Sequence, residues 1–222
     1  MKMDELMITR QDLIAILQQT AADIKKHINE LRDLDAALGD GDLGVTIELG
    51  SNAMSAYLYV QDEVDIGRML AKMGMDINKV NPSTFGTLLA SAFMGAGKAV
   101  QGKTTLTAGD LLTMGYGAID AIKKRGRAEV GDKTMLDTLV PAVEAYKESI
   151  SANNDINQAL QLAATASEKG LNATALMKAK FGRVSWRPDG GVGLKDGGAT
   201  AVYLLISSFT THLFETIKMK RD

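Results

Sequence analysis

Three aspartates lie close together in the segment LDAALGDGDLGVT, residues 34–46. Asp35, Asp40 and Asp42 are interleaved there with glycines. Carboxylate oxygens suit a hard divalent cation, and Mg²⁺ usually takes about one or two carboxylates while water and substrate phosphates complete its octahedron. The three aspartates therefore have the chemistry to hold a pair of such ions and to leave positions open for a phosphate ligand.

An ordinary structural role would explain part of this cluster. Asp42 could cap a following helix, and Asp40 could lie in a glycine-rich turn. Asp35 is harder to explain in this way, because it continues the apolar stripe of the preceding helix, where an unpaired carboxylate would be costly to bury. An EF-hand is not favoured, since a calcium loop counted from Asp35 or Asp40 would end at Thr46 or Ser51 instead of a glutamate.

Other glycine-rich loops suit an anionic ligand. Gly44, Gly86, Gly197 and Gly198 lie near predicted helix starts, where free N–H groups and the positive end of the helix dipole attract oxyanions. Arg183 could pair with a phosphate. The chain contains no Walker A motif, so a P-loop nucleotide site is not expected.

The pattern of apolar residues predicts an all-α protein, because helical spacing recurs along the chain and no convincing period-two run interrupts it. The first helix opens at a Thr9–Asp12 capping box and carries the stripe that ends at Asp35. The fourth is rich in small residues, which would let neighbouring backbones approach closely. The seven later helices are expected at about 45–60, at 65–79, after Pro82, from Thr107, from Asp132, from Asp155, and at 198–218.

The loops between these helices are of two kinds. Those after the second, fourth and sixth helices are short and plain. Those after the first, third, fifth and seventh contain GDGDLG, NPSTFG, RGRAEVGDKT and FGRVSWRPDGGVGLKDGG. Short connections favour antiparallel neighbours, so a bundle of eight antiparallel helices would bring all four unusual loops to one end. We therefore expect the ligand site at that end and a scaffold at the other.

Composition narrows the class of protein further. A chain of 222 residues with 45% hydrophobic residues and a formal net charge of -2 fits one globular domain without a bias toward nucleic acid or anionic membranes. The absence of cysteine excludes disulfides, a thiolate zinc site and a cysteine nucleophile. The N-terminus lacks the apolar core of a signal peptide, and no apolar run is long enough to span a membrane. These features predict a cytoplasmic protein with no nucleic-acid or membrane partner.

Taken together, the loops resemble the L subunit of dihydroxyacetone kinase, the DhaL-type or DAK2 domain family. LDAALGDGDLG is similar to the family pattern LDxxxGDGDHG, and RGRAEVGDKTMLDTLVPA is similar to RGKAxPGDKTMxDxxxP. GRVSW and KDGGATA resemble the family's GRASY and DPGATS. The resemblance extends over nearly the whole chain and implies one DhaL-type nucleotide-binding domain, residues 1–222.

The resemblance also implies a fold and a set of site residues. The family fold is a barrel of eight antiparallel helices with ADP or ATP and two Mg²⁺ ions at one end. Asp35, Asp40 and Asp42 would be the metal ligands, Met135 would contact the adenine, and no residue would act as a catalytic nucleophile. The positions implied to bind the nucleotide are Leu43, Gly44, Val45, Thr46, Thr84, Phe85, Gly126, Met135, Arg183, Asp196, Gly197 and Gly198.

The family's reaction implies partners. Phosphoryl transfer goes to dihydroxyacetone held covalently by a separate K subunit or domain, so we expect a K subunit to act in trans. In one class ATP is exchanged as substrate, and in the other ADP stays bound as a coenzyme and is rephosphorylated by the M subunit of a phosphotransferase system. The residues do not separate these classes, and they do not decide between a monomer and a homodimer.

Three departures from the family pattern bear on activity. Leu43 replaces a histidine beside the aspartates, Phe85 replaces a serine for which Thr84 could supply the hydroxyl, and Gly197 replaces a proline and should loosen its turn. They leave open a kinase subunit for a different small ketose and a regulatory homologue that binds nucleotide without transferring phosphate. A helical scaffold whose acidic loop is only a turn is a third alternative.

Overall fold

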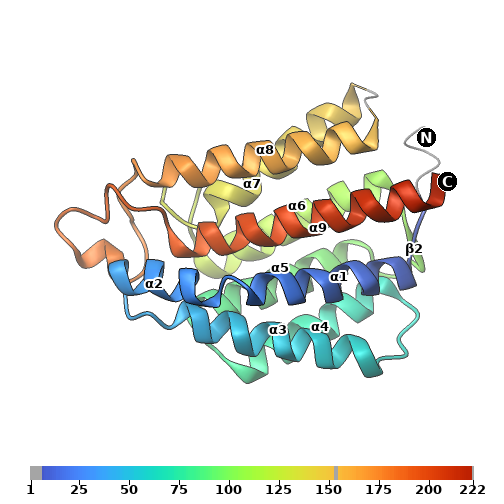
Figure 1. The fold of residues 1–222 in the computed structure, drawn as a ribbon, viewed down its shortest axis with the longest axis horizontal. Coiled ribbons are helices and arrows are strands. Elements are labelled where there is room, and N and C mark those ends of the chain that lie inside the picture. The colour runs from blue at the N-terminus through green and yellow to red at the C-terminus, as the bar shows by residue number, and fades with distance from the viewer. Residues whose placement is uncertain (1–6, 153–154, 222) are drawn as a thin grey trace.

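The computed structural model describes residues 7–152 and 155–221, and most of these residues are helical (Figure 1). The α-helices are α1 Arg10–Lys25, α2 Ile28–Leu38, α3 Leu43–Val60, α4 Ile66–Val80, α5 Thr84–Ala99, α6 Ala108–Gly126, α7 Leu136–Ser151, α8 Ile156–Thr174 and α9 Gly197–Arg221. Two short strands, β1 Ile8–Thr9 and β2 Thr105–Leu106, pair antiparallel. The all-α prediction is confirmed.

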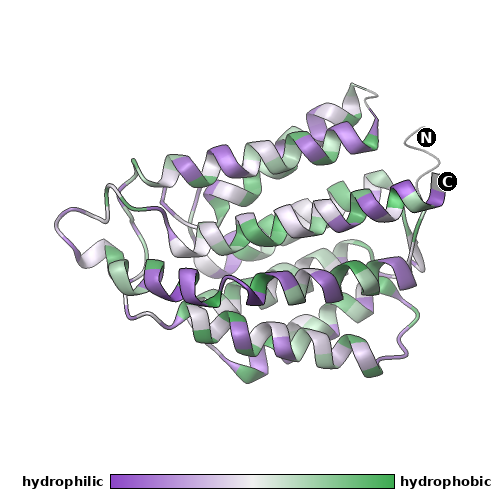
Figure 2. Ribbon diagram, in the orientation of Figure 1, coloured by the Kyte–Doolittle hydropathy of each residue, from purple (hydrophilic) through white to green (hydrophobic). Residues whose placement is uncertain are grey.

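The helices pack mainly against their neighbours along the chain. From α3 to α9 each helix contacts the next, and α1 contacts both α3 and α9, so the contacts close a ring. Figure 1 shows the long helices side by side, with the chain termini at one end and α2 at the other. In Figure 2 hydrophilic residues are interleaved with apolar ones along the helices. In the described part of the chain, no helix is long and apolar enough to cross a membrane.

Local sequence signals set most helix starts. Thr9 and Thr107 form the predicted capping boxes with Asp12 and Asp110, in which each threonine hydroxyl accepts a backbone N–H and each aspartate bonds back to the cap. The predicted inner face of α4 is buried throughout, at Ile66, Met69, Leu70, Met73 and Ile77. Capping and helical periodicity therefore located these elements correctly.

The first predicted helix is in fact two helices. The chain makes tighter turns at Lys26 and His27, whose N–H groups bond the carbonyls of Asp23 and Ile24, so α1 ends and α2 begins there. The described residues consequently contain nine α-helices instead of the eight expected. The apolar stripe continues across the break, because Ile24 and Leu31 are both buried.

The sixth predicted helix begins later than expected, at Leu136 instead of near Asp132. Gly131 has φ +96° and Lys133 has φ +61°, and these left-handed conformations cannot belong to a right-handed helix. The Asp137 carboxylate accepts hydrogen bonds from the N–H groups of Gly131 (2.5 Å) and Thr134 (2.7 Å) and so stabilises the turn. A left-handed turn held by Asp137 therefore replaces the first helical turn that the sequence suggested.

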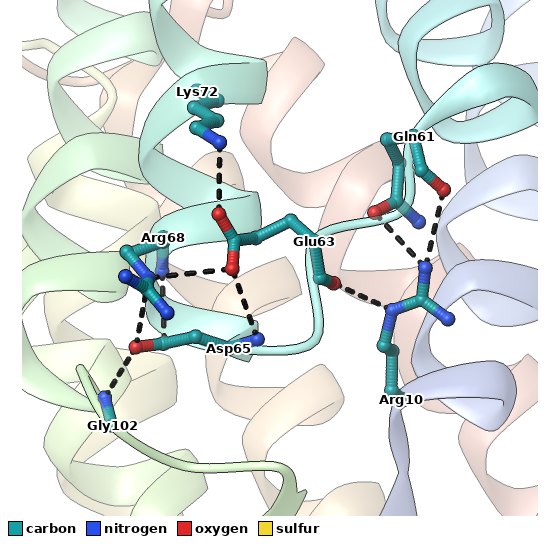
Figure 3. A network of polar contacts seen from close by, with 7 residues as sticks. All are labelled: Arg10, Gln61, Glu63, Asp65, Arg68, Lys72 and Gly102. Atoms are coloured by element: carbon teal, nitrogen blue, oxygen red, sulfur yellow. Dashed lines mark hydrogen bonds and ion pairs between the residues drawn. The ribbon is translucent and has the colours of Figure 1, made fainter.

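The end of the molecule opposite α2 is a polar scaffold (Figure 3). Arg10 at the start of α1 donates to the Glu63 carbonyl (2.7 Å) in the α3–α4 loop, and the Glu63 carboxylate pairs with Lys72 (2.8 Å). Asp65 caps α4 and also accepts the Gly102 N–H (2.8 Å) from the α5–α6 loop. These bonds hold two loops and one helix start in place, as expected for the scaffold end.

Helices α4 and α5 approach closely at a pair of glycines. A Cβ on Gly97 would stand 2.9 Å from the Ala71 nitrogen and would press on the Gly67 carbonyl oxygen. A Cβ on Gly67 would stand 2.5 Å from the Gln101 Cα. Real structures do not tolerate such distances, so close packing compensates for the low helix propensity of these glycines.

We predict that Gly97→Ala destabilises the protein by overpacking this contact. The expected cost is about 1–3 kcal/mol, which should lower the thermal midpoint by roughly 2–12 °C. Gly109→Ala, in the first turn of α6, is the matched control, because outside its chain neighbours and its own helix backbone the nearest heavy atom to the new Cβ is Thr107 Oγ1, 3.8 Å away. Its midpoint should stay unchanged or rise with helix propensity. Equal effects of the two substitutions in calorimetry would contradict the close contact.

Candidate functional site

One cavity of about 260 Å³ lies at the α2 end of the molecule. All four unusual loops contribute to its wall, which confirms that they meet at the same end. The lining residues are Asp35, Leu38, Gly39, Asp40, Asp42, Leu43, Thr84, Phe85, Leu88, Lys133, Thr134, Met135, Phe181, Gly182, Arg183, Val184, Asp196, Gly197 and Gly198. In Figure 1 the long loop between α8 and α9 extends beside α2 at this end.

Four helices begin at this cavity. Leu43 and Thr84 are the first residues of α3 and α5, Met135 immediately precedes α7, and Gly197 opens α9; all four line the wall. Each helix start presents backbone N–H groups and the positive end of its dipole. The convergence of four such ends makes the cavity suited to a multiply charged anion such as a polyphosphate.

The three negatively charged aspartates lie close together at the same cavity as these positive helix ends. Asp35 lies in the last turn of α2, and the turn at Gly39 and Gly41 (φ +74°) returns the chain so that Asp40 and Asp42 face it. One carboxylate oxygen from each aspartate lies within 4.8 Å of the others. This spacing allows one hard cation to contact all three carboxylates.

The capping explanation for Asp42 is not supported. Asp42 occupies the N-cap position of α3, but its side chain makes no capping hydrogen bond. Asp35 instead accepts the Leu43 N–H (3.2 Å). The carboxylate of Asp42 is therefore left exposed toward the cavity, where a ligand can reach it.

The electrostatics of the cluster favour a bound cation. Burial raises the pKa of Asp42, and the negative charges of Asp40 and Asp35 raise it further, while Arg183 acts in the opposite direction. Arg183 forms an ion pair with Asp40. A divalent cation would relieve the repulsion among the carboxylates, and an all-oxygen donor set matches Mg²⁺, so the residues fit this metal.

Asp196 adds a fourth carboxyl group to the wall. Its side chain accepts the Ala199 N–H (2.7 Å) and so caps α9. Burial raises the pKa of Asp196 to about 6, although the Ala199 hydrogen bond and the charge of Lys133 oppose the shift. The first turn of α9 is therefore held by a group that changes charge near neutral pH.

Most residues implied to bind nucleotide do line the cavity, but four lie elsewhere. Gly44 packs against α2, where a Cβ would stand 2.8 Å from Arg32 Cβ. Val45 is 52% exposed and does not line the cavity, and Thr46 is buried and bonded to the hydroxyl of Ser83. Gly126 lies behind Leu88, not in the wall.

Sequence reasoning did not single out several residues of the wall. Phe181, Thr134 and Leu88 add apolar and hydroxyl surface, and Lys133 is the one buried cation in the lining set. The signal for Lys133 was present in the GDKTM motif, but a lysine in a loop is usually solvated. Only its tertiary surroundings show that it is enclosed.

Comparisons with known proteins identify the family of this chain. Residues 37–211 match the DAK2 domain. The ADP-binding subunit DhaL of the PEP-dependent dihydroxyacetone kinase of Escherichia coli K12 is 33% identical over 79% of this chain and 84% of its own length. The corresponding subunit of kinase 2 of Listeria innocua is 30% identical over 97% of this chain and 100% of its own length.

A solved structure has the same fold. The crystal structure of the dihydroxyacetone kinase from C. freundii in complex with AMP-PNP and Mg²⁺ superposes with a TM-score of 0.69 at 24% identity. The match covers 89% of this chain but only 33% of that one, so the chain corresponds to about a third of the larger enzyme. The chain belongs to the DAK2 domain family.

We predict that Asp42→Asn stabilises the metal-free protein slightly at pH 7. The pKa of Asp42 is raised in the folded protein, so its ionisation above that pKa disfavours folding, and the gain from asparagine should shrink as the pH falls toward the unfolded value. The same variant should lose stabilisation by Mg²⁺. Thermal unfolding at several pH values measures both effects.

Asp33→Asn is the control for this prediction, because Asp33 is exposed on α2 and pairs with Arg32 outside the cluster. It should be no more stable than the unsubstituted protein at pH 7. A less stable Asp42→Asn protein at pH 7 would mean that the Asp42 carboxylate has a stabilising partner and would contradict its place in a crowded cluster.

Proposed function

We propose that this protein is the Mg-nucleotide-binding subunit of a dihydroxyacetone kinase or of a kinase for a related small ketose. The observation that carries the proposal is the meeting of three carboxylates within 4.8 Å at a cavity onto which four helix starts converge. Family membership and the names of the two relatives support it. We further propose that residues 1–222 form one such domain and that the ring of helices is the family's helical barrel.

The aspartates and the helix starts would divide the binding of a nucleotide between them. Asp35, Asp40 and Asp42 would hold Mg²⁺, which when bound neutralises phosphate charge for phosphoryl transfer. The N–H groups at the starts of α3, α5 and α9 would bind phosphate oxygens, and Arg183 would pair with one of them. Met135, which is 3% exposed, offers an apolar surface for the base.

Phosphoryl transfer by this chain would need the acceptor to be presented by a partner. The subunits named ADP-binding in the relatives are separate chains of a similar length, whereas in the C. freundii enzyme the matching part is a third of the chain. We therefore propose a K subunit that holds the ketose. Because the relatives are named PEP- or PTS-dependent and ADP-binding, we favour ADP as a bound coenzyme with an M subunit as the phosphate source.

A second candidate function is a regulatory module that binds Mg-nucleotide without transferring phosphate. Leu43 is 4% exposed and places an apolar side chain beside the aspartates, where the family pattern has histidine. The Phe85 ring lies where a Cβ on Gly198 would meet it at 3.4 Å, so it fills space next to the α9 start. These two side chains favour altered transfer more than lost binding. Turnover with a purified K subunit separates the two functions.

We expect ADP or ATP to raise the thermal midpoint only when Mg²⁺ is present. Ligand at about 100 times its dissociation constant adds about 2.7 kcal/mol, which corresponds to roughly 5–10 °C for a domain of this size. EDTA should abolish the shift, because the phosphates would then face uncompensated carboxylates. A larger shift with ADP than with ATP would favour the coenzyme class. A shift that persists in EDTA would contradict the metal-dependent site.

Asp40→Asn should abolish this Mg-nucleotide shift and leave the helical circular dichroism unchanged. The substitution removes one carboxylate of the three without changing the size of the side chain. Asp62→Asn, an exposed aspartate in the loop at the opposite end, is the control and should keep the full shift. Unchanged affinity in Asp40→Asn would remove this residue from the metal ligands.

A further inference from the structure

The segment between α8 and α9, residues 175–196 and here called the wall segment, forms much of the cavity with little secondary structure of its own. Its one regular element is the short 3₁₀ helix Arg183–Trp186. Four of its glycines have positive φ, among them Gly182 and Gly191. A segment of this kind would have many conformations in isolation. Some contact must select the one in which Arg183 reaches Asp40.

Lys133 provides such a contact from the opposite side of the cavity. Its ammonium donates to the carbonyl oxygens of Thr174 (2.7 Å), Gly191 (2.9 Å) and Leu194 (2.5 Å). An ammonium has three N–H donors, so all of them are satisfied by backbone. In the described part of the chain, no carboxylate lies within ion-pair distance of it. The three acceptors lie before, within and near the end of the wall segment.

The burial of Lys133 makes this contact specific. The residue is 2% exposed, and burial lowers the pKa of its amine while the charges of Asp196 and Asp189 oppose the shift. A buried ammonium that lost its carbonyl partners would pay a large desolvation cost. The segment can therefore not move away from Lys133 without removing two of the three acceptors of a buried charge.

The backbone conformation at Lys133 is unusual and is held by neighbouring residues. Lys133 has φ +61°, an uncommon conformation for a residue with a side chain, and the adjacent turn is held by the Asp137 carboxylate. Asp132 also accepts the Glu129 N–H (2.8 Å). The strained backbone aims the lysine inward instead of toward solvent.

The same contact fixes the start of α9. Thr174, whose carbonyl accepts from Lys133, uses its hydroxyl to accept the Asp196 N–H (3.0 Å). Asp196 in turn caps α9. Lys133 thus connects, through one residue, to the helix start that lines the cavity.

We infer that Lys133 is a positioning residue that clamps the wall segment so that Arg183 and the α9 start face the aspartates. The ammonium and its three carbonyl partners are here called the Lys133 clamp. Its effect on ligand binding rests on the proposed function, whereas its effect on the segment does not. Lys133 would thus order the site without needing to contact the ligand.

The test compares Lys133→Met with Lys180→Met. Methionine keeps an unbranched chain and removes the ammonium. Lys180 is on the wall segment and pairs with Asp132 (2.5 Å); its own side chain is 69% exposed, whereas that of Asp132 is 7% exposed. Its removal takes a lysine charge from the same segment, leaves Asp132 bonded to the Glu129 N–H and does not touch the three carbonyl contacts of Lys133. Both variants retain Phe181 and Trp186, exposed sites for chymotrypsin within the segment.

In Lys133→Met we expect native-state cleavage at Phe181 and Trp186 to accelerate about tenfold or more, because the segment opens without global unfolding. Trp186 is the only tryptophan, and its fluorescence anisotropy should show faster local motion. The dissociation constant for Mg-ADP should rise about tenfold or more. In Lys180→Met each quantity should stay within about threefold of the unsubstituted protein.

Each outcome has a definite meaning. Unchanged cleavage and anisotropy in Lys133→Met would overturn the clamp. Loss of Mg-ADP binding without any change in cleavage or anisotropy would also overturn it, because Lys133 would then act on the ligand directly. If the unsubstituted protein binds no Mg-ADP, the proposed function fails while cleavage still tests the clamp.

A measurement without substitution covers the case in which Lys133→Met does not fold. The Gly193 N–H bonds the Ala175 carbonyl (2.7 Å) and the Ala179 N–H bonds the Gly190 carbonyl (3.0 Å), both within the wall segment. In the ligand-free protein, these two amides should be protected from hydrogen exchange as strongly as amides at helix ends. Unprotected exchange at both would overturn the clamp.

Discussion

The alternation of helix direction is the constraint on which the site depends. Because α3, α5, α7 and α9 all begin at the α2 end, their dipoles add a positive field at one cavity. That field opposes the negative end of α2, in whose last turn Asp35 lies, and the mutual repulsion of the three carboxylates, which lie within 4.8 Å. A fold that reversed one of these four helices would remove one positive end from the cavity and add a negative end to that of α2. The direction in which the helices pack therefore determines the electrostatics of the cavity.

Two different cations complete this arrangement. Arg183 is half exposed and pairs with Asp40, so water and ligands can compete for both groups. Lys133 is enclosed and bonded only to carbonyl oxygens, so its contacts persist whether or not the carboxylates are neutralised. The Arg183 guanidinium can exchange Asp40 for a ligand during binding, whereas the Lys133 ammonium keeps its three carbonyl partners. This division of roles follows from burial, because solvent screens the first interaction and not the second.

The residues that depart from the family pattern occupy the same small region. Leu43 and Phe85 both line the cavity, and Gly197 begins α9 between them and Asp196. The backbone around them is intact, since the Leu43 N–H still bonds Asp35 and Asp196 still caps α9. The substitutions thus change the side chains presented to a ligand while the aspartates keep their spacing. Such a change is better suited to altering what is transferred than to preventing a metal from binding.

The sequence alone determined the class of fold, the capping boxes at Thr9 and Thr107, the buried face of α4 and the meeting of four loops at one end, because periodicity and capping are local. It also singled out Asp35, whose place on an apolar stripe had no ordinary explanation. Tertiary structure decided the rest. The late start of α7 depends on the left-handed residues Gly131 and Lys133, and the break at His27 on tight turns that the apolar stripe does not signal. Gly44 and Gly126 pack against other helices, Thr46 is buried and Val45 is exposed, so these four residues fall outside the wall. Lys133 shows the physical reason most clearly: a lysine is solvated or enclosed according to which carbonyls surround it, and its three lie far along the chain.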